Sequence, residues 1–219
     1  MRLHWLVIAY TLCACERADD PSVAGTTRVC GAISVTRRIV RGPIDLTAEG
    51  TSDWAAWGAT SVHDFDRKAT GGGQIAAWSV VGAGIVYGYG NAYHEPGTDG
   101  FTWRDGTPVA VEATPQYSGV WIDGAPNGFA TTAPAGASPH TLRVYVGGAD
   151  ATGTFTAHLS DGSAPDYVDA NGLGSVAESW AGVYQLVYRS ASPSARIEVS
   201  WIQSSAGGGD VNFSAASLQ

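Results

Sequence analysis

The chain has 219 residues, of which 44% are hydrophobic and 15% charged, and this is enough apolar material for one large hydrophobic core. Its formal net charge of −8 argues against nucleic acid as a partner, because an acidic surface repels the phosphate backbone. The 29 glycines and eight tryptophans favour short strands joined by tight turns, since exposed helix positions prefer Ala, Leu, Glu and Lys.

Residues 1–15 have the features of a signal peptide. Arg2 precedes an apolar run that ends at Ala14 and is shorter than the roughly 20 residues of a membrane-spanning helix. The ending LCAC at 12–15 resembles the lipobox of bacterial lipoproteins. This resemblance implies export to the outer membrane or cell surface, with Cys15 lipidated as the first mature residue and with the lipid as the only membrane contact.

The three cysteines fit export in either of two ways. Lipoprotein processing removes Cys13 and acylates Cys15, which leaves Cys30 without a partner and excludes a disulfide framework or a zinc site. If an ordinary signal peptidase cleaves after Ala14 instead, Cys15 stays unmodified and a Cys15–Cys30 disulfide is the rival prediction.

Residues 16–42 are interpreted as a tether or an edge strand. A strand is expected within 28–40, and Arg37, Arg38 and Arg41 make this the basic part of the chain. These cations either contact an anionic envelope surface or protect a sheet edge from pairing with other chains. The chain therefore divides into three parts: 1–15, 16–42 and a β domain over 43–219.

Apolar and polar residues alternate repeatedly along the β domain, which is the pattern of half-buried strands. The alternation is clearest at 141–146 and 196–202, and only 53–58 is expected to form a short helical turn. Dipeptides such as Asp105-Gly106 and Asp123-Gly124 supply turns between strands. We therefore predict an all-β fold in which two antiparallel sheets pack as a sandwich of the jelly-roll type. The expected strands are 44–46, 74–81, 85–89, 100–103, 109–113, 119–122, 128–132, 140–146, 152–159, 184–188, 197–202 and 211–218.

Several sequence blocks follow one another along this domain: LTAEGTSDWAAWG (46–58), FTWRDGTP (101–108), SGVWIDGAPNGFATTAPA (118–135), HTLRVYVGG (140–148), AHLSDGSAPDYVD (157–169), GVYQLVYRSAS (182–192) and IEVSWIQ (197–203). In this order they resemble a jelly-roll module of secreted bacterial proteins that is similar to galactose-binding-like and carbohydrate-binding domains. The resemblance implies a jelly roll that binds a glycan or a related surface ligand. Ala56 stands where that module commonly has His, so a ligand role of that His is not carried over.

Aromatic side chains beside glycines and at strand ends are the candidate ligand-binding residues, because aromatic faces and a few polar groups together suit sugars. The glycine-rich stretch 82–100 is the best candidate for a ligand loop, since glycine lets aromatic side chains project from an adaptable backbone. The alternative interpretation places the tryptophans in the core and treats the loops as plain turns. The candidate residues are Trp54, Trp57, Tyr89, Tyr93, His94, Trp103, Arg104 and Trp121.

Asp161, Asp166 and Asp169 concentrate carboxylates in one segment and are suited in kind to a structural calcium ion, although their spacing is not that of an EF-hand. No nucleophile elbow, HExxH, CxxC or phosphate loop is present, so no catalytic residue is assigned. The sequence therefore predicts a non-catalytic module with no cofactor other than calcium. Two alternatives stay open: a structural or adhesive subunit that assembles through strand edges, and a glycoside hydrolase whose paired carboxylates only the fold brings together.

Overall fold

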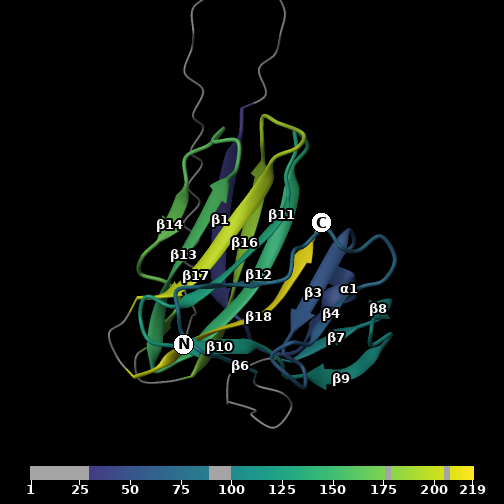
Figure 1. Ribbon diagram of the computed structural model, residues 1–219. Helices are drawn as coiled ribbons and strands as arrows, with labels where there is room; N and C mark the ends of the chain where they lie inside the picture. Colours follow the sequence, from purple (N-terminus) through teal and green to yellow (C-terminus); the bar gives the residue numbers. More distant parts are fainter. Residues whose placement is uncertain (1–29, 89–99, 176–178, 205–207) are drawn as a thin grey trace, which may run out of the picture.

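The computed structural model describes residues 30–88, 100–175, 179–204 and 208–219, and these residues form three β-sheets and one short helix, α1 (Leu46–Glu49) (Figure 1). The nine-stranded sheet contains β1 (Ala32–Ile39), β3 (Asp53–Trp57), β4 (Phe65–Lys68), β6 (Val86–Gly88), β8 (Gly106–Thr107), β10 (Val120–Asp123), β12 (His140–Ala149), β16 (Trp180–Arg189) and β18 (Asp210–Leu218). The six-stranded sheet contains β5 (Ser79–Val81), β11 (Gly128–Pro134), β13 (Ala151–Leu159), β14 (Tyr167–Asp169), β15 (Gly174–Ser175) and β17 (Arg196–Gln203). The three-stranded sheet contains β2 (Ile44–Asp45), β7 (Phe101–Trp103) and β9 (Glu112–Gln116).

Strand pairing is antiparallel throughout the described residues except between β2 and β7. The nine-stranded sheet includes the order β10-β18-β12-β16, and the six-stranded sheet includes the order β11-β17-β13-β14. From β10 onward the chain passes from one of these sheets to the other at nearly every connection. Residues far apart in the sequence therefore become neighbours on facing sheets.

The main hydrophobic core lies between these two sheets. Its residues follow the two-residue period of strands, so that β13 is buried at every second position. Phe155 of the six-stranded sheet stacks on Tyr184 of the nine-stranded sheet with ring centroids 3.9 Å apart. Trp201 donates from Nε1 to the Gly147 carbonyl at 3.1 Å. The all-β prediction is thus confirmed, and buried aromatic rings fill the space between the sheets.

A second core covers the opposite face of the nine-stranded sheet near β3, where α1 and the three-stranded sheet pack. All five residues of β3 are buried, because Trp57 points into the main core and Trp54 points into the second core. The helical turn expected at 53–58 is therefore wrong, since this segment is a strand covered on both faces. The short helix lies earlier in the chain, where Asp45 caps the N–H groups of Thr47 and Ala48 at 3.0 and 3.1 Å.

The nine-stranded sheet includes β1, which lies within the segment 16–42 that is expected to be a tether or an edge strand. β1 is an edge strand that pairs with β16 over its whole length. Arg37 of β1 forms an ion pair with Asp169 of β14, and Asp169 also accepts a hydrogen bond from the Tyr184 hydroxyl at 2.9 Å. Through these contacts Arg37 links the edge strand β1 to the six-stranded sheet.

Each expected strand overlaps one in the structure, whereas β3, β4, β8, β14 and β15 are not among the expected ones. Cys30 is disulfide-bonded, so the expectation that it stands alone is not met. The other two cysteines, Cys13 and Cys15, lie outside the described residues. Among the described residues, no helix combines the length and the apolar character needed to cross a membrane.

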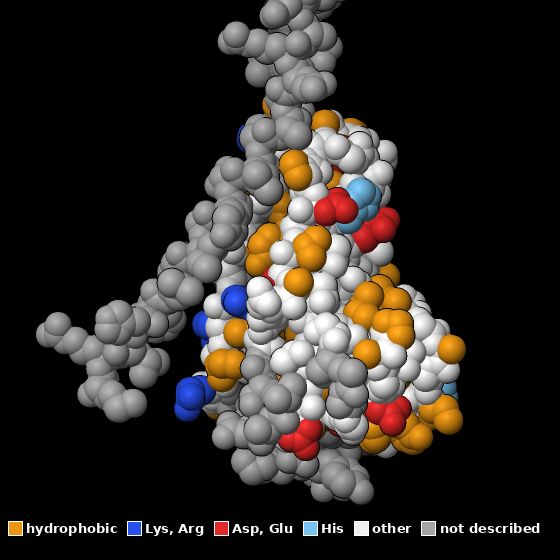
Figure 2. Space-filling model, turned by 90° about the vertical axis from the view of Figure 1, so that its left-hand side faces the viewer, with side chains coloured by type: hydrophobic (Ala, Val, Ile, Leu, Met, Phe, Trp, Pro, Cys, Tyr) orange, Lys and Arg blue, Asp and Glu red, His pale blue; other side chains and the backbone are white. Residues whose placement is uncertain are grey.

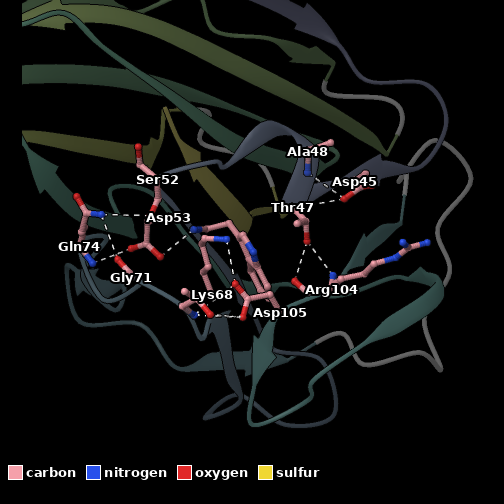
Figure 3. A network of polar contacts seen from close by, with 12 residues as sticks. Asp45, Thr47, Ala48, Ser52, Asp53, Lys68, Gly71, Gln74, Arg104 and Asp105 are labelled. Atoms are coloured by element: carbon pink, nitrogen blue, oxygen red, sulfur yellow. Dashed lines mark hydrogen bonds and ion pairs between the residues drawn. The ribbon is translucent and has the colours of Figure 1, made fainter.

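The carboxylate of Asp53 fastens the chain between β4 and β5 to β3. Asp53 is 1% exposed and accepts the backbone N–H groups of Trp54, Gln74 and Ile75 at 2.8, 2.7 and 2.8 Å. The Gln74 side-chain amide donates two hydrogen bonds, to the Ser52 and Gly71 carbonyls (Figure 3). A buried acid can be retained here because N–H donors surround it.

We expect Asp53→Ala to lower the free energy of unfolding by about 3 kcal/mol, because it leaves buried N–H groups without an acceptor. Asp53→Asn keeps one acceptor oxygen and should lose less. Asp123→Ala, at an exposed position, serves as the control and should stay within about 0.5 kcal/mol of wild type. Urea unfolding measures all three, and equal losses for the two alanine variants would contradict this role of Asp53.

Candidate ligand-binding site

Three of the tryptophans expected to bind ligand belong to the core instead. Trp54, Trp57 and Trp103 are at most 2% exposed. Trp54 lies against Trp103 with ring centroids 5.5 Å apart, and Trp57 stacks on Phe213 at 5.0 Å. Their assignment to an exposed sugar-binding surface is therefore corrected, because layers on both faces of β3 cover these rings.

Trp121 takes part in an aromatic pair that does reach the surface. It lies directly opposite Tyr87 on the paired strands β10 and β6, and the two rings stack with centroids 4.4 Å apart and planes 21° apart. The neighbours of Trp121 along β10, Val120 and Ile122, point into the main core, so the pair faces outward. Tyr87 is 42% exposed, and among the described residues it is the one aromatic side chain in the exposed class.

Polar side chains continue this outward face on the next strand, β18. Asn212 lies opposite Trp121, and Asp210 lies opposite Asp123. On the strand beyond, a Cβ atom at Gly147 would come within 2.7 Å of both amide atoms of Asn212, so only glycine leaves room for that amide. Asn212 is 4% exposed, so the aromatic pair and the carboxylates of Asp123 and Asp210 are the groups that this face presents, a combination suited to a polyhydroxylated ligand.

Tyr89, Tyr93 and His94 follow β6 in the chain and lie outside the described residues, so their role stays a prediction. Arg104 is exposed, but it follows β7 of the three-stranded sheet and not the strands of the aromatic pair. Its backbone N–H and carbonyl bond to the Thr47 hydroxyl at 2.7 and 2.8 Å, which ties β7 to α1 (Figure 3).

The three aspartates expected to bind calcium have separate partners. Asp161 accepts hydrogen bonds from Ser163 and Ser192 within turns. Asp166 bonds to Nδ1 of His158 at 2.6 Å, which raises the pKa of that imidazole, and Asp169 pairs with Arg37. No group of three His, Cys, Asp or Glu side chains arranged for a metal ion occurs in the described part of the chain. Calcium therefore stays a prediction without a site among these residues.

An exposed apolar loop that the sequence does not predict, residues 107–111, runs from the last residue of β8 to the start of β9. Val109 and Val111 are 42% and 57% exposed, although a strand is expected from 109 and begins only at Glu112. The Val109 N–H donates to Oδ1 of Asp66 at 3.0 Å, and the Val109 carbonyl accepts from Nε1 of Trp103 at 3.0 Å. We call residues 107–111 the apolar tip.

Asp66 is a buried acid beneath this tip. Burial raises its pKa above the ordinary value, and the charges of Asp64 and Glu112 act in the same direction, while the Val109 N–H opposes the shift. Burial thus makes ionisation of Asp66 unfavourable, yet its carboxylate holds the backbone of an exposed loop through the Val109 N–H. Sequence alone gives no signal of this, because the pairing of β4 with β8 brings the two segments together.

The comparisons with known proteins identify no family for this chain. No protein-family model matches the sequence, and no curated protein matches it. Among solved structures, the enzymatically active domain of tailspike protein 4 of bacteriophage CBA120 is similar, with a TM-score of 0.36 and 15% identity, over 67% of this chain and 20% of that chain. The match thus spans one fifth of the tailspike chain, and at this TM-score it assigns neither fold nor function here.

The raised pKa of Asp66 predicts a pH-dependent stability difference for Asp66→Asn, which keeps an acceptor oxygen but cannot ionise. Between the unfolded and folded pKa values the native protein binds more protons than the unfolded chain, so wild-type stability falls as pH rises through that window. The free energy of unfolding of the variant, relative to wild type, should therefore increase with pH across it.

Urea unfolding at a series of pH values from acid to neutral measures this difference. Val111→Ala changes the same loop without removing an ionisable group, and its difference from wild type should not vary with pH. A difference for Asp66→Asn that is equally flat would contradict the assignment.

Proposed function

We propose that this protein is a non-catalytic module that binds carbohydrate on the face carrying Tyr87 and Trp121. The observation that carries the proposal is the placement of the stacked pair on the outer face, while Trp54, Trp57 and Trp103 fill the cores. Apolar aromatic surface in contact with water is unfavourable in free energy, and contact with a sugar ring would remove that surface from water.

The chemistry of this face fits a sugar in two respects. The ring faces offer a flat apolar surface for the C–H groups of a pyranose, and Asp123 and Asp210 offer hydrogen bonds to its hydroxyls. Cross-strand pairing and stacking hold Tyr87 and Trp121 against each other, so little side-chain freedom remains to be lost on binding.

We further infer that the two large sheets form a jelly roll. The orders β10-β18-β12-β16 and β11-β17-β13-β14 support this, together with the alternation of the chain between the sheets. In this description, β3, β4 and β8 extend one sheet, and the three-stranded sheet is an addition that covers its outer face.

A glycan array tests the binding proposal. We expect the full chain to bind a defined set of glycans, and Trp121→Ala and Tyr87→Ala to weaken that binding at least tenfold, or about 1.4 kcal/mol. Tyr87→Phe keeps the ring and should retain most affinity. Val168→Ala, an exposed site on the six-stranded sheet, is the matched surface control. Absence of binding by folded protein would refute the proposal.

The same face also supports a second candidate, a glycoside hydrolase. Asp123 and Asp210 are direct cross-strand neighbours, and side chains so placed have Cβ atoms about 4.5–5.5 Å apart. From these Cβ positions the two carboxyl groups can adopt the separation of about 5–5.5 Å that retaining glycosidases use. Hydrolysis of a bound glycan that is lost in Asp123→Asn would establish this alternative, whereas binding without turnover supports the module.

We also propose that the chain is exported with a disulfide at its N-terminus in place of a lipid. Removal of residues 1–14 would discard Cys13 and leave Cys15 as the partner for Cys30 within the chain. The disulfide at Cys30 supports this arrangement, because one sulfur atom cannot be both acylated and oxidised. Cleavage by an ordinary signal peptidase then replaces the lipidation at Cys15 that the lipobox resemblance implies.

Peptide mapping of the exported protein without reduction distinguishes the two modifications. We expect a Cys15–Cys30 linked peptide that separates on reduction, and a mature chain that begins at Cys15. A diacylglyceryl mass on the Cys15 peptide, with Cys30 present as a thiol, would contradict the disulfide and restore the lipoprotein prediction.

A further inference from the structure

We propose that the apolar tip, residues 107–111, is a phospholipid-binding loop that inserts Val109 and Val111 into the surface of a bilayer. This site is separate from the aromatic pair, since the tip connects β8 to β9 while the pair lies on β6 and β10. The inference therefore does not depend on carbohydrate binding.

The tip is held in one shape by groups that the core supplies. Asp66 and Trp103, both buried, bond to the N–H and the carbonyl of Val109. The Gly106 N–H closes the base of the loop by donating to the Ala110 carbonyl at 2.9 Å. With both polar backbone groups of Val109 satisfied internally, that residue can leave water without losing hydrogen bonds.

The side chains of the tip fit lipid better than protein. Residues 108–111 are Pro, Val, Ala and Val, all in the exposed class, with no aromatic ring and no side-chain donor. Protein interfaces depend on Trp, Tyr and Arg, and valine is under-represented among their energetically important residues. Aliphatic side chains enter a lipid surface without needing a complementary pocket, and binding then scales with the apolar area buried.

Charged side chains of both signs lie around the tip, since Glu112 follows it directly and Asp64 is close enough to raise the pKa of Asp66. Arg67 lies directly across the β4–β8 pair from Thr107, and both Arg67 and Arg104 are exposed. In Figure 3 the Arg104 side chain extends away from the polar network. The carboxylate of Asp105 forms an ion pair with Lys68 at 3.1 Å and accepts a hydrogen bond from the Thr70 hydroxyl. Arg67 points to the opposite face of β4 from Asp66, which holds Val109. Arginine binds phosphate through paired N–H groups, so Arg104 is the side chain that would meet a headgroup beside the inserted valines.

Vesicle sedimentation tests the proposal with a closely matched control. Val109→Ser combined with Val111→Ser should reduce partition onto phosphatidylcholine–phosphatidylglycerol vesicles at least tenfold. Val187→Ser combined with Val168→Ser should leave it unchanged, because those valines are 43% and 57% exposed on other strands. Arg104→Ala should weaken partition severalfold relative to Arg189→Ala, another exposed arginine. Unchanged thermal unfolding establishes that the tip variants fold.

A fluorescent label reports the contact independently of any N-terminal modification. An environment-sensitive dye on Ala110→Cys should shift to shorter wavelength with vesicles, whereas the same dye on Ala191→Cys, at another exposed loop, should not. Equal partition of the two double-serine variants, or no dye shift at residue 110, would overturn the proposal. Failure of wild type to sediment with either phosphatidylcholine or mixed vesicles would overturn it as well.

Discussion

The structure depends on the burial of β3 from both sides. A strand at the surface of a two-layer sandwich normally has one wet face, but Trp57 enters the main core and Trp54 enters the second. The two indoles together bring α1, the three-stranded sheet and both large sheets into contact with one strand. Asp53, at the start of the same strand, ties the following loop to it. The third layer, made of α1 and the three-stranded sheet, thus packs on β3 as well as on Tyr145, Val183 and Ala215 of the neighbouring strands.

This third layer decides which aromatic rings stay at the surface. Around β3 it covers the outer face of the nine-stranded sheet, so Trp54 and Trp103 are buried there. Tyr87 and Trp121 face outward from the same sheet on β6 and β10, and neither belongs to the second core. The difference between buried Trp103 and Trp121 thus follows from strand position, because each begins the same pattern Trp-x-Asp-Gly in the sequence.

The sequence predicts strands that have one wet face, such as β12 and β17, and misses β3, which has none. Alternation identifies 141–146 and 196–202, which lie in β12 and β17, because polar residues mark their outward positions. β3 carries the run DWAAW and has no such alternation, since both of its faces are covered. The pairing of Tyr87 with Trp121 is also beyond sequence reasoning, because it joins residues 34 positions apart through a register that only the sheet defines.

The two proposed binding surfaces are connected through β18. A β-bulge opposite Tyr145 and Val146 divides this strand, and its residues before the bulge pair with β10 while those after it pair with β3. One path continues to β6 and the aromatic pair, and the other continues through β4 to β8 and the apolar tip. Because a bulge bends and twists its strand, the two paths diverge. β18 thus fixes the position of the proposed glycan-binding face relative to the proposed lipid-binding loop.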